Sequence, residues 1–272
     1  MLFYPNAKIN IGLNIVHKRT DGYHDLETVF YPIPFSDILE IVPNSEGGIG
    51  DCQISQSGIT FDGAPKDNIC SKAYYLLAKD FQIPSVTIHL HKQIPVGAGL
   101  GGGSSDAAFT LKGLNAMFNL AIPTEKLAIY ASKLGADCAF FIDNSAKYAK
   151  GIGDEFTDCN VNLAGKYLVL ICPTIHSSTA EAYSMVKPTR SKDLLSVIQS
   201  DISEWKKTIF NDFENSIFPL YPEVEDLKLE LYAKGALFAS MSGSGSSVFG
   251  IFEEHPNCYF ELGDTNYQVF AL

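Results

Sequence analysis

Residues Pro95–Ala108 read PVGAGLGGGSSDAA and place a glycine-rich loop between a strand pattern and a helix pattern. Before the loop, apolar residues alternate along Ser85–Ile94 as in a half-buried strand, and Lys92 continues the apolar side. After the loop, apolar residues recur every three or four positions from 107 to 118, as on one face of an amphipathic helix. The order predicts a strand, a loop and a helix whose N-terminus is capped by Ser104, Ser105 and Asp106.

Five of the seven residues from Gly97 to Gly103 are glycines, and this composition favours an anion site. Without Cβ atoms the backbone can approach an anion closely, and positive φ angles let successive N–H groups converge on it. The dipole of the following helix adds to the attraction. A flexible turn is the simpler alternative, but such turns seldom lead directly into a helix. We therefore predict that the loop binds phosphate groups.

Two common phosphate loops do not fit the stretch. A Walker A loop needs a lysine directly after its last glycine, whereas Gly103 is followed by Ser104. Residues 97–102 satisfy the G-x-G-x-x-G pattern of dinucleotide-binding folds. Such a fold also needs an acidic residue at the end of a second strand about 20 residues further on, where this chain has Pro123 and Thr124 opening another helix pattern. The dinucleotide interpretation is therefore weak.

The composition predicts a globular protein without a nucleic-acid or membrane surface. The chain has 272 residues, 46% of them hydrophobic and 19% charged, so it can bury a large core and form two domains. A net charge of -11 argues against partners such as nucleic acid or an anionic membrane, because both need clustered positive charge. The longest apolar runs, such as residues 167–172, are too short to cross a bilayer.

Arginines and cysteines set two further limits. Arg19 and Arg190 are the only arginines, so lysines and backbone amides must supply most of the positive potential around a phosphate. The six cysteines are scattered and form no C-x-x-C pair, which indicates free thiols in a reducing compartment. Since no signal or transit peptide precedes the first strand pattern, we expect a cytoplasmic protein.

The N-terminal strand pattern brings a lysine and an asparagine together. Apolar residues alternate with polar ones along residues 7–15, so Lys8 and Asn10 project side by side. A lysine on a strand face is ordinarily a solvated charge. A second polar segment, DGYHDLETVF at residues 21–30, follows a turn. Its Tyr23 and His24, taken alone, would more often be packing and surface residues than ligands.

Three later segments add candidates. Asn68 stands where it can cap a helix. Asp137 lies between small residues and an aromatic run, where a partly buried carboxylate needs a partner, and a structural capping role is an open alternative. The loop SGSGSS at residues 242–247 joins two strand patterns and could be a plain hairpin. The chain turns polar at residues 158–165, which predicts domains at 1–158 and 159–272.

Several of these segments together resemble the GHMP kinases, a family of small-molecule kinases. The similar parts are P-x-G-x-G-L-G-G-G-S-S-D-A-A at residues 95–108, the A-K-I-N and D-G-Y-H patterns between residues 7 and 30, and the glycine-serine loop at residues 242–247. They occur in the family's order over nearly the whole chain. The resemblance implies an α+β fold of two domains, the first like domain 2 of ribosomal protein S5 and the second ferredoxin-like.

The resemblance also implies a reaction, the transfer of the γ-phosphoryl group of ATP, with Mg²⁺, to a hydroxyl of a small alcohol. In the family pattern G-A-D-V-P-F-F the aspartate is catalytic, and here Asp137 stands at that place, followed by Cys138 and Ala139 instead of Val and Pro. This departure affects the stiffness of the loop rather than the carboxylate. We hypothesise that Asp137 accepts the hydroxyl proton, while Lys8 keeps Asp137 ionised and stabilises charge on the phosphoryl group.

The family's ligand contacts map onto this sequence by motif. The residues implied for ATP are Asn68, Lys92, Pro95, Val96, Gly97, Ala98, Gly99, Leu100, Gly101, Gly102, Gly103, Ser104 and Ser105. The residues implied for the second substrate are Asn10, Tyr23, His24, Phe30, Thr179 and Tyr183. Ser105 and the phosphates are the candidate ligands of the metal, and the nucleotide and water are expected to hold most of its coordination, because the chain offers no conspicuous carboxylate cage.

The D-G-Y-H segment resembles the N-terminal motif of one member of the family, and this resemblance implies a cytidine diphosphate-linked polyol as the acceptor. It also implies Tyr23 and Tyr183 as stacking faces and His24 at the base edge. Another GHMP acceptor, such as homoserine, mevalonate or a sugar, is an alternative. A non-catalytic nucleotide-binding regulator is a second one, against which the presence of Lys8, Asn10 and Asp137 speaks. The expected assembly is a monomer or a weak homodimer.

Overall fold

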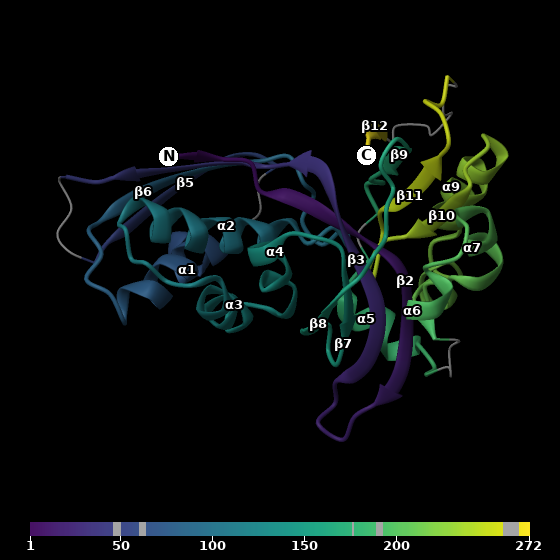
Figure 1. Cartoon of the computed structure of the whole chain (residues 1–272), viewed down its shortest axis with the longest axis horizontal. Helices are drawn as coiled ribbons and strands as arrows, with labels where there is room; N and C mark the ends of the chain where they lie inside the picture. The colour runs from purple at the N-terminus through teal and green to yellow at the C-terminus, as the bar shows by residue number, and fades with distance from the viewer. Residues whose placement is uncertain (46–49, 60–63, 176, 189–192, 258–266) are drawn as a thin grey trace. The chain divides into compact units, whose positions relative to one another are not determined.

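Figure 1 shows a computed structural model of the chain, which describes residues 1–45, 50–59, 64–175, 177–188, 193–257 and 267–272. The backbone divides into two compact units that interleave along the sequence. The first consists of residues 1–7, 35–96 and 101–145, and the second of residues 8–34, 97–100 and 146–272. The glycine loop therefore contributes residues to both units. The domain boundary expected at residue 158 divides the chain in another way and stays a prediction.

The first unit is built on a mixed sheet of four strands in the order β1-β4-β6-β5. The strands are β1 (Leu2–Phe3), β4 (Ile38–Pro43), β5 (Cys52–Gly58) and β6 (Val86–Lys92). Strand β5 runs parallel to β6, and the other pairs are antiparallel. The strand predicted before the glycine loop is confirmed as β6, and its side chains alternate between buried and more exposed as the pattern required.

Two helices of the first unit lie side by side along one face of this sheet (Figure 1). The helical segments are η1 (Pro65–Asp67), α1 (Ile69–Ala78), α2 (Gly102–Met117), α3 (Thr124–Ser132), η2 (Ala136–Cys138) and α4 (Phe140–Asp143). The central helix α2 packs closely on the sheet because Gly113 has no side chain. A Cβ there would lie 2.8 Å from side-chain atoms of Ile41 and Phe3.

The second unit contains two further sheets. One has the order β2-β3-β7-β8, with β2 (Asn6–Lys18), β3 (His24–Ser36), β7 (Lys147–Lys150) and β8 (Glu155–Asp158). The other is antiparallel in the order β10-β11-β9-β12, with β9 (Tyr167–Ile171), β10 (Phe238–Met241), β11 (Val248–Phe252) and β12 (Tyr267–Ala271). The helices are α5 (Thr179–Met185), α6 (Leu194–Val197), α7 (Ile202–Thr208), α8 (Glu214–Ile217) and α9 (Pro222–Ala233). The α+β class predicted from the sequence is confirmed.

Apolar side chains from β2, β9, β10, β11, α8 and α9 form one core in this unit. Strand β2 is buried on both faces over most of its length, so its polar residues are enclosed rather than solvated. This burial positions Lys8 and Asn10, because a buried amine or amide must find hydrogen-bonding partners in the protein.

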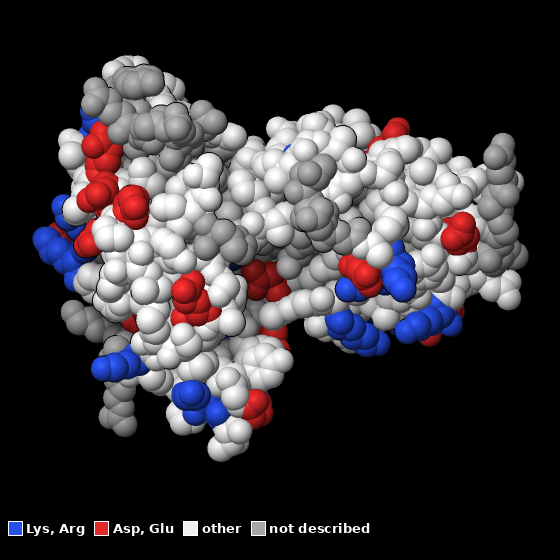
Figure 2. All heavy atoms as spheres, turned by 180° about the vertical axis from the view of Figure 1, so that it is seen from behind, with Lys and Arg blue, Asp and Glu red and all other residues white. Residues whose placement is uncertain are grey.

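The surface carries no single dominant charge on the face shown in Figure 2. Lysine and arginine lie scattered among acidic and uncharged residues there, rather than gathered into one basic patch. Within the described segments, none of the helices combines the length and the apolar character that a membrane span requires.

Candidate active site

The head of helix α2 offers backbone N–H groups to an anion. The helix begins at Gly102, and its N-cap Gly101 has φ 70° and ψ 15°, a left-handed conformation that favours glycine. Because a glycine cap has no side chain, the N–H groups of the first turn stay available for a ligand. The predicted capping role of Ser104, Ser105 and Asp106 is wrong, since all three lie inside the helix.

The earlier half of the glycine loop packs on the glycine-serine loop at residues 242–247. The hydroxyl of Ser242 donates to the carbonyl oxygen of Gly99 at 2.9 Å, and the N–H of Ser247 donates to the carbonyl oxygen of Ala98 at 3.3 Å. A Cβ on Gly99, whose φ is 78°, would lie 2.0 Å from the carbonyl oxygen of Ser242. The two backbones can approach this closely only because Gly99 has no side chain. The glycine-serine loop is therefore not a plain hairpin, because it also packs against the glycine-rich loop.

Lys8 and Asn10 lie side by side on β2, as predicted. The Lys8 ammonium donates to Asn10 Oδ1 at 2.6 Å and to the carbonyl oxygen of Gly99 at 3.1 Å. It also lies 4.9 Å from the centre of the Phe30 ring. Lys8 is 3% exposed, so the interpretation of a solvated lysine is wrong. The amine is held directly against Gly99 of the glycine loop, and its role toward the phosphoryl group stays a prediction.

A buried threonine that the sequence analysis did not single out completes this cluster. Asn10 Nδ2 donates to Thr28 Oγ1 at 2.9 Å, and the Thr28 hydroxyl donates to the carbonyl oxygen of Gly12 at 2.6 Å. The backbone N–H of Asn10 donates to the hydroxyl of Ser242 at 3.3 Å. The chain of contacts fixes the orientation of the Asn10 amide. Thr28 belongs to the segment DGYHDLETVF at residues 21–30. Its place on β3, the strand next to β2, was the sequence signal that could have identified it.

Two aromatic rings predicted for the second substrate meet in the second unit. The rings of His24 and Tyr183 are stacked, with their centres 5.0 Å apart and an interplanar angle of 28°. Tyr183 and Phe213 also pack edge to face, at 4.7 Å between ring centres. Burial first, and then the charges of nearby Lys18 and His17, lower the pKa of His24. A neutral imidazole has one donor and one acceptor nitrogen, which suits the edge of a nucleobase.

The other two residues predicted for this subsite differ in their surroundings. The side chain of Tyr23 is largely exposed, at 61%. Thr179 is the first residue of α5, and its hydroxyl lies 3.2 Å from that of Ser244 in the glycine-serine loop. The sequence-predicted stacking faces are thus unequal, because Tyr183 is braced by neighbours while Tyr23 is open to solvent.

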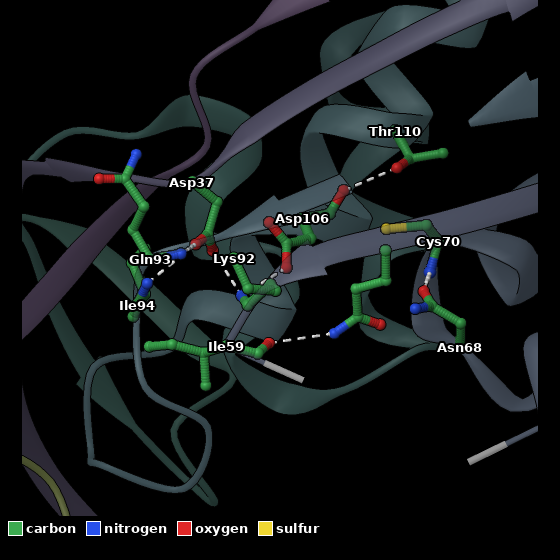
Figure 3. A network of polar contacts seen from close by, with 10 residues as sticks. Asp37, Ile59, Asn68, Cys70, Lys92, Gln93, Ile94, Asp106 and Thr110 are labelled. Carbon is green, nitrogen blue, oxygen red and sulfur yellow. Dashed lines mark hydrogen bonds and ion pairs between the residues drawn. The ribbon is translucent and has the colours of Figure 1, made fainter. Parts of the chain in front are cut away.

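In the first unit, Lys92 joins two buried carboxylates (Figure 3). Its ammonium donates to Asp37 Oδ2, and to Asp106 Oδ2 at 2.8 Å. Burial opposes the charge on Lys92, but Asp106 and Asp37 outweigh it and raise the pKa of the ammonium. Burial likewise raises the pKa of Asp106, to about 8, while Lys92 opposes the rise and Asp37 adds to it. The nucleotide contact predicted for Lys92 stays a prediction.

The remaining residues predicted for the nucleotide line the start of α1 and the outer part of the loop. Asn68 caps α1 as predicted, since its Oδ1 accepts from the N–H of Cys70 at 2.8 Å. Val96 is exposed and Pro95 half-buried, whereas Leu100 is buried in the interior. The hydroxyl of Ser105 is buried and has no hydrogen-bond partner among the described residues. A buried hydroxyl at a helix head is one that a bound anion could satisfy.

Asp137 lies in the short helix η2 and is half-buried. The thiol of the next residue, Cys138, is fully buried, and burial raises its pKa to about 11, although the hydroxyl of Ser104 lowers it. This thiol therefore stays protonated at neutral pH, and the catalytic role of Asp137 stays a prediction. Asp137 belongs to the first unit and Lys8 to the second, and their predicted pairing stays a prediction.

Among the residues that the structure describes, histidine, cysteine, aspartate and glutamate form no group of three or more arranged to hold a metal ion. Lysines and backbone amides, rather than the two arginines, were expected to supply most of the positive potential around a phosphate. Arg19 is exposed and pairs with Asp21 and Asp25, and Arg190 lies outside the described residues. The cations placed by the described site are therefore lysines, as expected.

Known proteins match most of the chain. Residues 68–145 match the family model of the GHMP kinases N terminal domain, and residues 192–257 match that of the GHMP kinases C terminal. The 4-diphosphocytidyl-2-C-methyl-D-erythritol kinase of Bacteroides fragilis is 54% identical, over 93% of this chain and 92% of that relative. The protein of the same name from Azobacteroides pseudotrichonymphae is 48% identical, over 99% of this chain and 98% of the relative.

A solved structure gives the same answer for the fold. The crystal structure of a 4-(cytidine 5'-diphospho)-2C-methyl-D-erythritol kinase superposes with a TM-score of 0.78 and 31% identity. The match covers 92% of this chain and 90% of that one. The predicted two-domain kinase fold is confirmed by these similarities, and ATP is the phosphoryl donor that the family uses. The chain belongs to the GHMP kinase family.

Proposed function

We propose that this enzyme transfers the γ-phosphoryl group of ATP to the 2-hydroxyl of 4-diphosphocytidyl-2-C-methyl-D-erythritol, a step of the methylerythritol phosphate route to isoprenoids. The observation that carries the proposal is the 54% identity, over 93% of the chain, to a relative that bears the name of this kinase. The stacked pair of His24 and Tyr183 supports the same acceptor, because a cytosine needs an aromatic face and a polar edge.

The backbone amides at the head of α2 bind the phosphates of ATP in this proposal. Their N–H groups point from a helix N-terminus that has a glycine cap, and the helix dipole favours the negative charge. Lys8 supplies the positive charge that stabilises the transferring phosphoryl group. Its ammonium is already fixed by Asn10 and the carbonyl of Gly99, so little reorganisation is needed during the reaction.

Asp137 accepts the proton of the acceptor hydroxyl as the hydroxyl attacks the γ-phosphorus. The position of this carboxylate beside the hydroxyl is what the role requires, because phosphoryl transfer depends chiefly on positioning and on stabilising charge. Asn10 orients the polyol, since Thr28 and Lys8 hold its amide in one orientation. Tyr183 provides the stacking surface for cytosine, and His24 contacts the edge of the base.

Mg²⁺ bound with ATP would be held mostly by the phosphates and water, and Ser105 is the candidate ligand from the protein. Among the described residues, no three or more histidine, cysteine, aspartate or glutamate side chains are grouped so that they could hold a metal ion. An ion that is bound to the nucleotide does not need such a group. The metal supplies charge neutralisation of the phosphate oxygens. The free thiols, including those of buried Cys70 and Cys138, support a reducing compartment such as the cytoplasm.

The test is an assay of ADP release with a panel of acceptors. The protein is incubated with ATP, Mg²⁺ and either the cytidyl polyol, homoserine, mevalonate or a hexose. We expect release of ADP that depends on the cytidyl polyol and is at least 100-fold slower with each of the others. Turnover of another alcohol at a similar rate would show a different GHMP kinase. ATP binding without turnover of any acceptor would show a nucleotide-binding regulator.

A further inference from the structure

Asp37 lies at the point where the strand β6 passes into the glycine loop, and it is fully buried. Its carboxylate accepts three hydrogen bonds from donors on consecutive residues. Oδ1 accepts from the backbone N–H of Gln93 at 2.6 Å and from that of Ile94 at 2.9 Å, and Oδ2 accepts from the Lys92 ammonium. Figure 3 shows these contacts converging on one side chain. The two residues that directly precede Pro95, at the start of the loop, are therefore held by a side chain outside the loop.

The same ammonium reaches the far end of the loop. Lys92 donates to Asp106, which is the fifth residue of α2, at 2.8 Å. A Cβ on Gly102, the first residue of that helix, would lie 3.3 Å from the Lys92 nitrogen. The ammonium thus rests against the helix head, where Gly102 leaves room for it. Through Lys92, Asp37 is linked both to the start of the loop and to the helix that follows it.

We propose that Asp37 is a positioning residue for ATP, which acts through Lys92 to set the span of the phosphate-binding loop before the nucleotide arrives. Three of the seven residues from Pro95 to Gly101 are glycines, and the hydrogen bonds from Ser242 and Ser247 hold only the middle of this segment. Pinning both ends of so glycine-rich a segment removes conformational freedom that nucleotide binding would otherwise have to restrict. The proposal rests on the proposed function only in taking ATP as the ligand of this loop.

The two carboxylates that share Lys92 provide a matched pair of variants. Asp106 accepts one hydrogen bond through Oδ2, and its Oδ1 is buried without a partner among the described residues. Asn at position 106 therefore keeps the one acceptor that is used. Asp37 uses both oxygens to accept from three N–H donors. After Asp37→Asn the side chain has one oxygen acceptor left, and its NH₂ group faces at least one N–H donor. The same chemical change should have unequal effects at the two positions.

The experiment measures ADP affinity by calorimetry and the steady-state constants for both substrates. We expect Asp37→Asn to weaken ADP binding and raise KM for ATP at least tenfold, with KM for the cytidyl polyol changed less than twofold. Asp106→Asn should stay within threefold of the parent in all of these. A merely structural role would lower the active fraction and kcat while leaving both KM values unchanged, and that result would overturn the proposal. ADP affinity is read without an acceptor, so a wrong acceptor assignment would not affect it.

A second measurement on the unaltered protein covers the case in which Asp37→Asn does not fold. Hydrogen exchange of the Gln93 and Ile94 amides is followed with and without ADP. Because Asp37 accepts from both amides in the free protein, we expect at least 100-fold protection without nucleotide and little change on adding it. Rapid exchange that becomes protected only with ADP would mean that the nucleotide orders the loop, and the proposal would fail.

Discussion

The buried carboxyl of Asp106 should make the stability of this protein depend on pH in a way that one substitution removes. Burial raises its pKa from an ordinary value of 3.8 to about 8, although Lys92 favours the charged form. The side chain is 1% exposed, so solvent screens it little. In Asp106→Asn the position cannot titrate, while the acceptor for Lys92 remains. The difference between parent and variant thus isolates a single proton.

The sign follows from proton binding. Between about pH 4 and pH 8 the folded parent holds a proton on Asp106 that the unfolded chain has released, so the free energy of unfolding falls as the pH rises through this window. One proton corresponds to a slope of at most about 1.4 kcal/mol per pH unit. Integrated from pH 6 to pH 8 with a folded pKa of about 8, the parent loses about 2 kcal/mol relative to Asp106→Asn. For a protein of this size that is about 4–8 °C in melting temperature.

Thermal melts followed by circular dichroism at pH 6, 7 and 8 measure this difference. Asp158→Asn is the matched control, because its carboxylate is 92% exposed and undergoes the same chemical change at the surface. We expect the melting temperature of the parent to fall toward pH 8 relative to Asp106→Asn, and to follow that of Asp158→Asn. Parallel curves for the parent and Asp106→Asn between pH 6 and pH 8 would refute the reasoning.

Substitutions at Gly99, Tyr183 and Asp137, with control variants for the first two, test the loop packing, the acceptor site and the proposed base. Gly99→Ala would bring a Cβ to 2.0 Å from the Ser242 carbonyl, so we expect a lower melting temperature. Gly103→Ala, whose Cβ meets nothing within 4 Å, should leave the melting temperature unchanged or slightly raised. Equal melting temperatures for the two variants would contradict the close packing of Gly99 on Ser242. Tyr183→Ala should raise KM for the cytidyl polyol about 10-fold or more, because it removes a stacking contact worth about 1–3 kcal/mol, while Tyr183→Phe should keep the KM of the parent. An unchanged KM in Tyr183→Ala would mean that the cytosine base does not stack on Tyr183. Asp137→Asn should lower kcat by about 10²- to 10⁴-fold with ADP affinity retained; activity within a few-fold of the parent would exclude its role as the base.

Local patterns predicted the elements around the glycine loop well. The alternation before the loop predicted β6 and placed Lys92 on its buried side, and the cap at Asn68 was confirmed with its hydrogen bond to Cys70. Both signals are local, because strand period and helix capping depend on residues only a few positions apart. The start of α2 was misjudged because Gly101, in a left-handed conformation, serves as the cap instead of the serines.

The surroundings of charged residues could not be predicted in this way. Lys8 alternates with apolar residues as a half-exposed strand residue would, yet β2 is buried on both faces. Whether the second face of a strand is covered depends on residues such as Ser242, far away in the sequence. Asp37 was not singled out, because an aspartate before a strand reads as an ordinary turn residue. Its role depends on Lys92 and on two backbone amides more than fifty positions later.

The most direct test of the proposed reaction is to identify the product by ³¹P nuclear magnetic resonance and mass spectrometry. The protein, ATP, Mg²⁺ and 4-diphosphocytidyl-2-C-methyl-D-erythritol are incubated together. We predict ADP and an equal amount of a new phosphomonoester on the 2-hydroxyl, with the cytidine diphosphate linkage intact. ADP and inorganic phosphate with an unchanged acceptor, or a phosphoryl group on another hydroxyl, would contradict it.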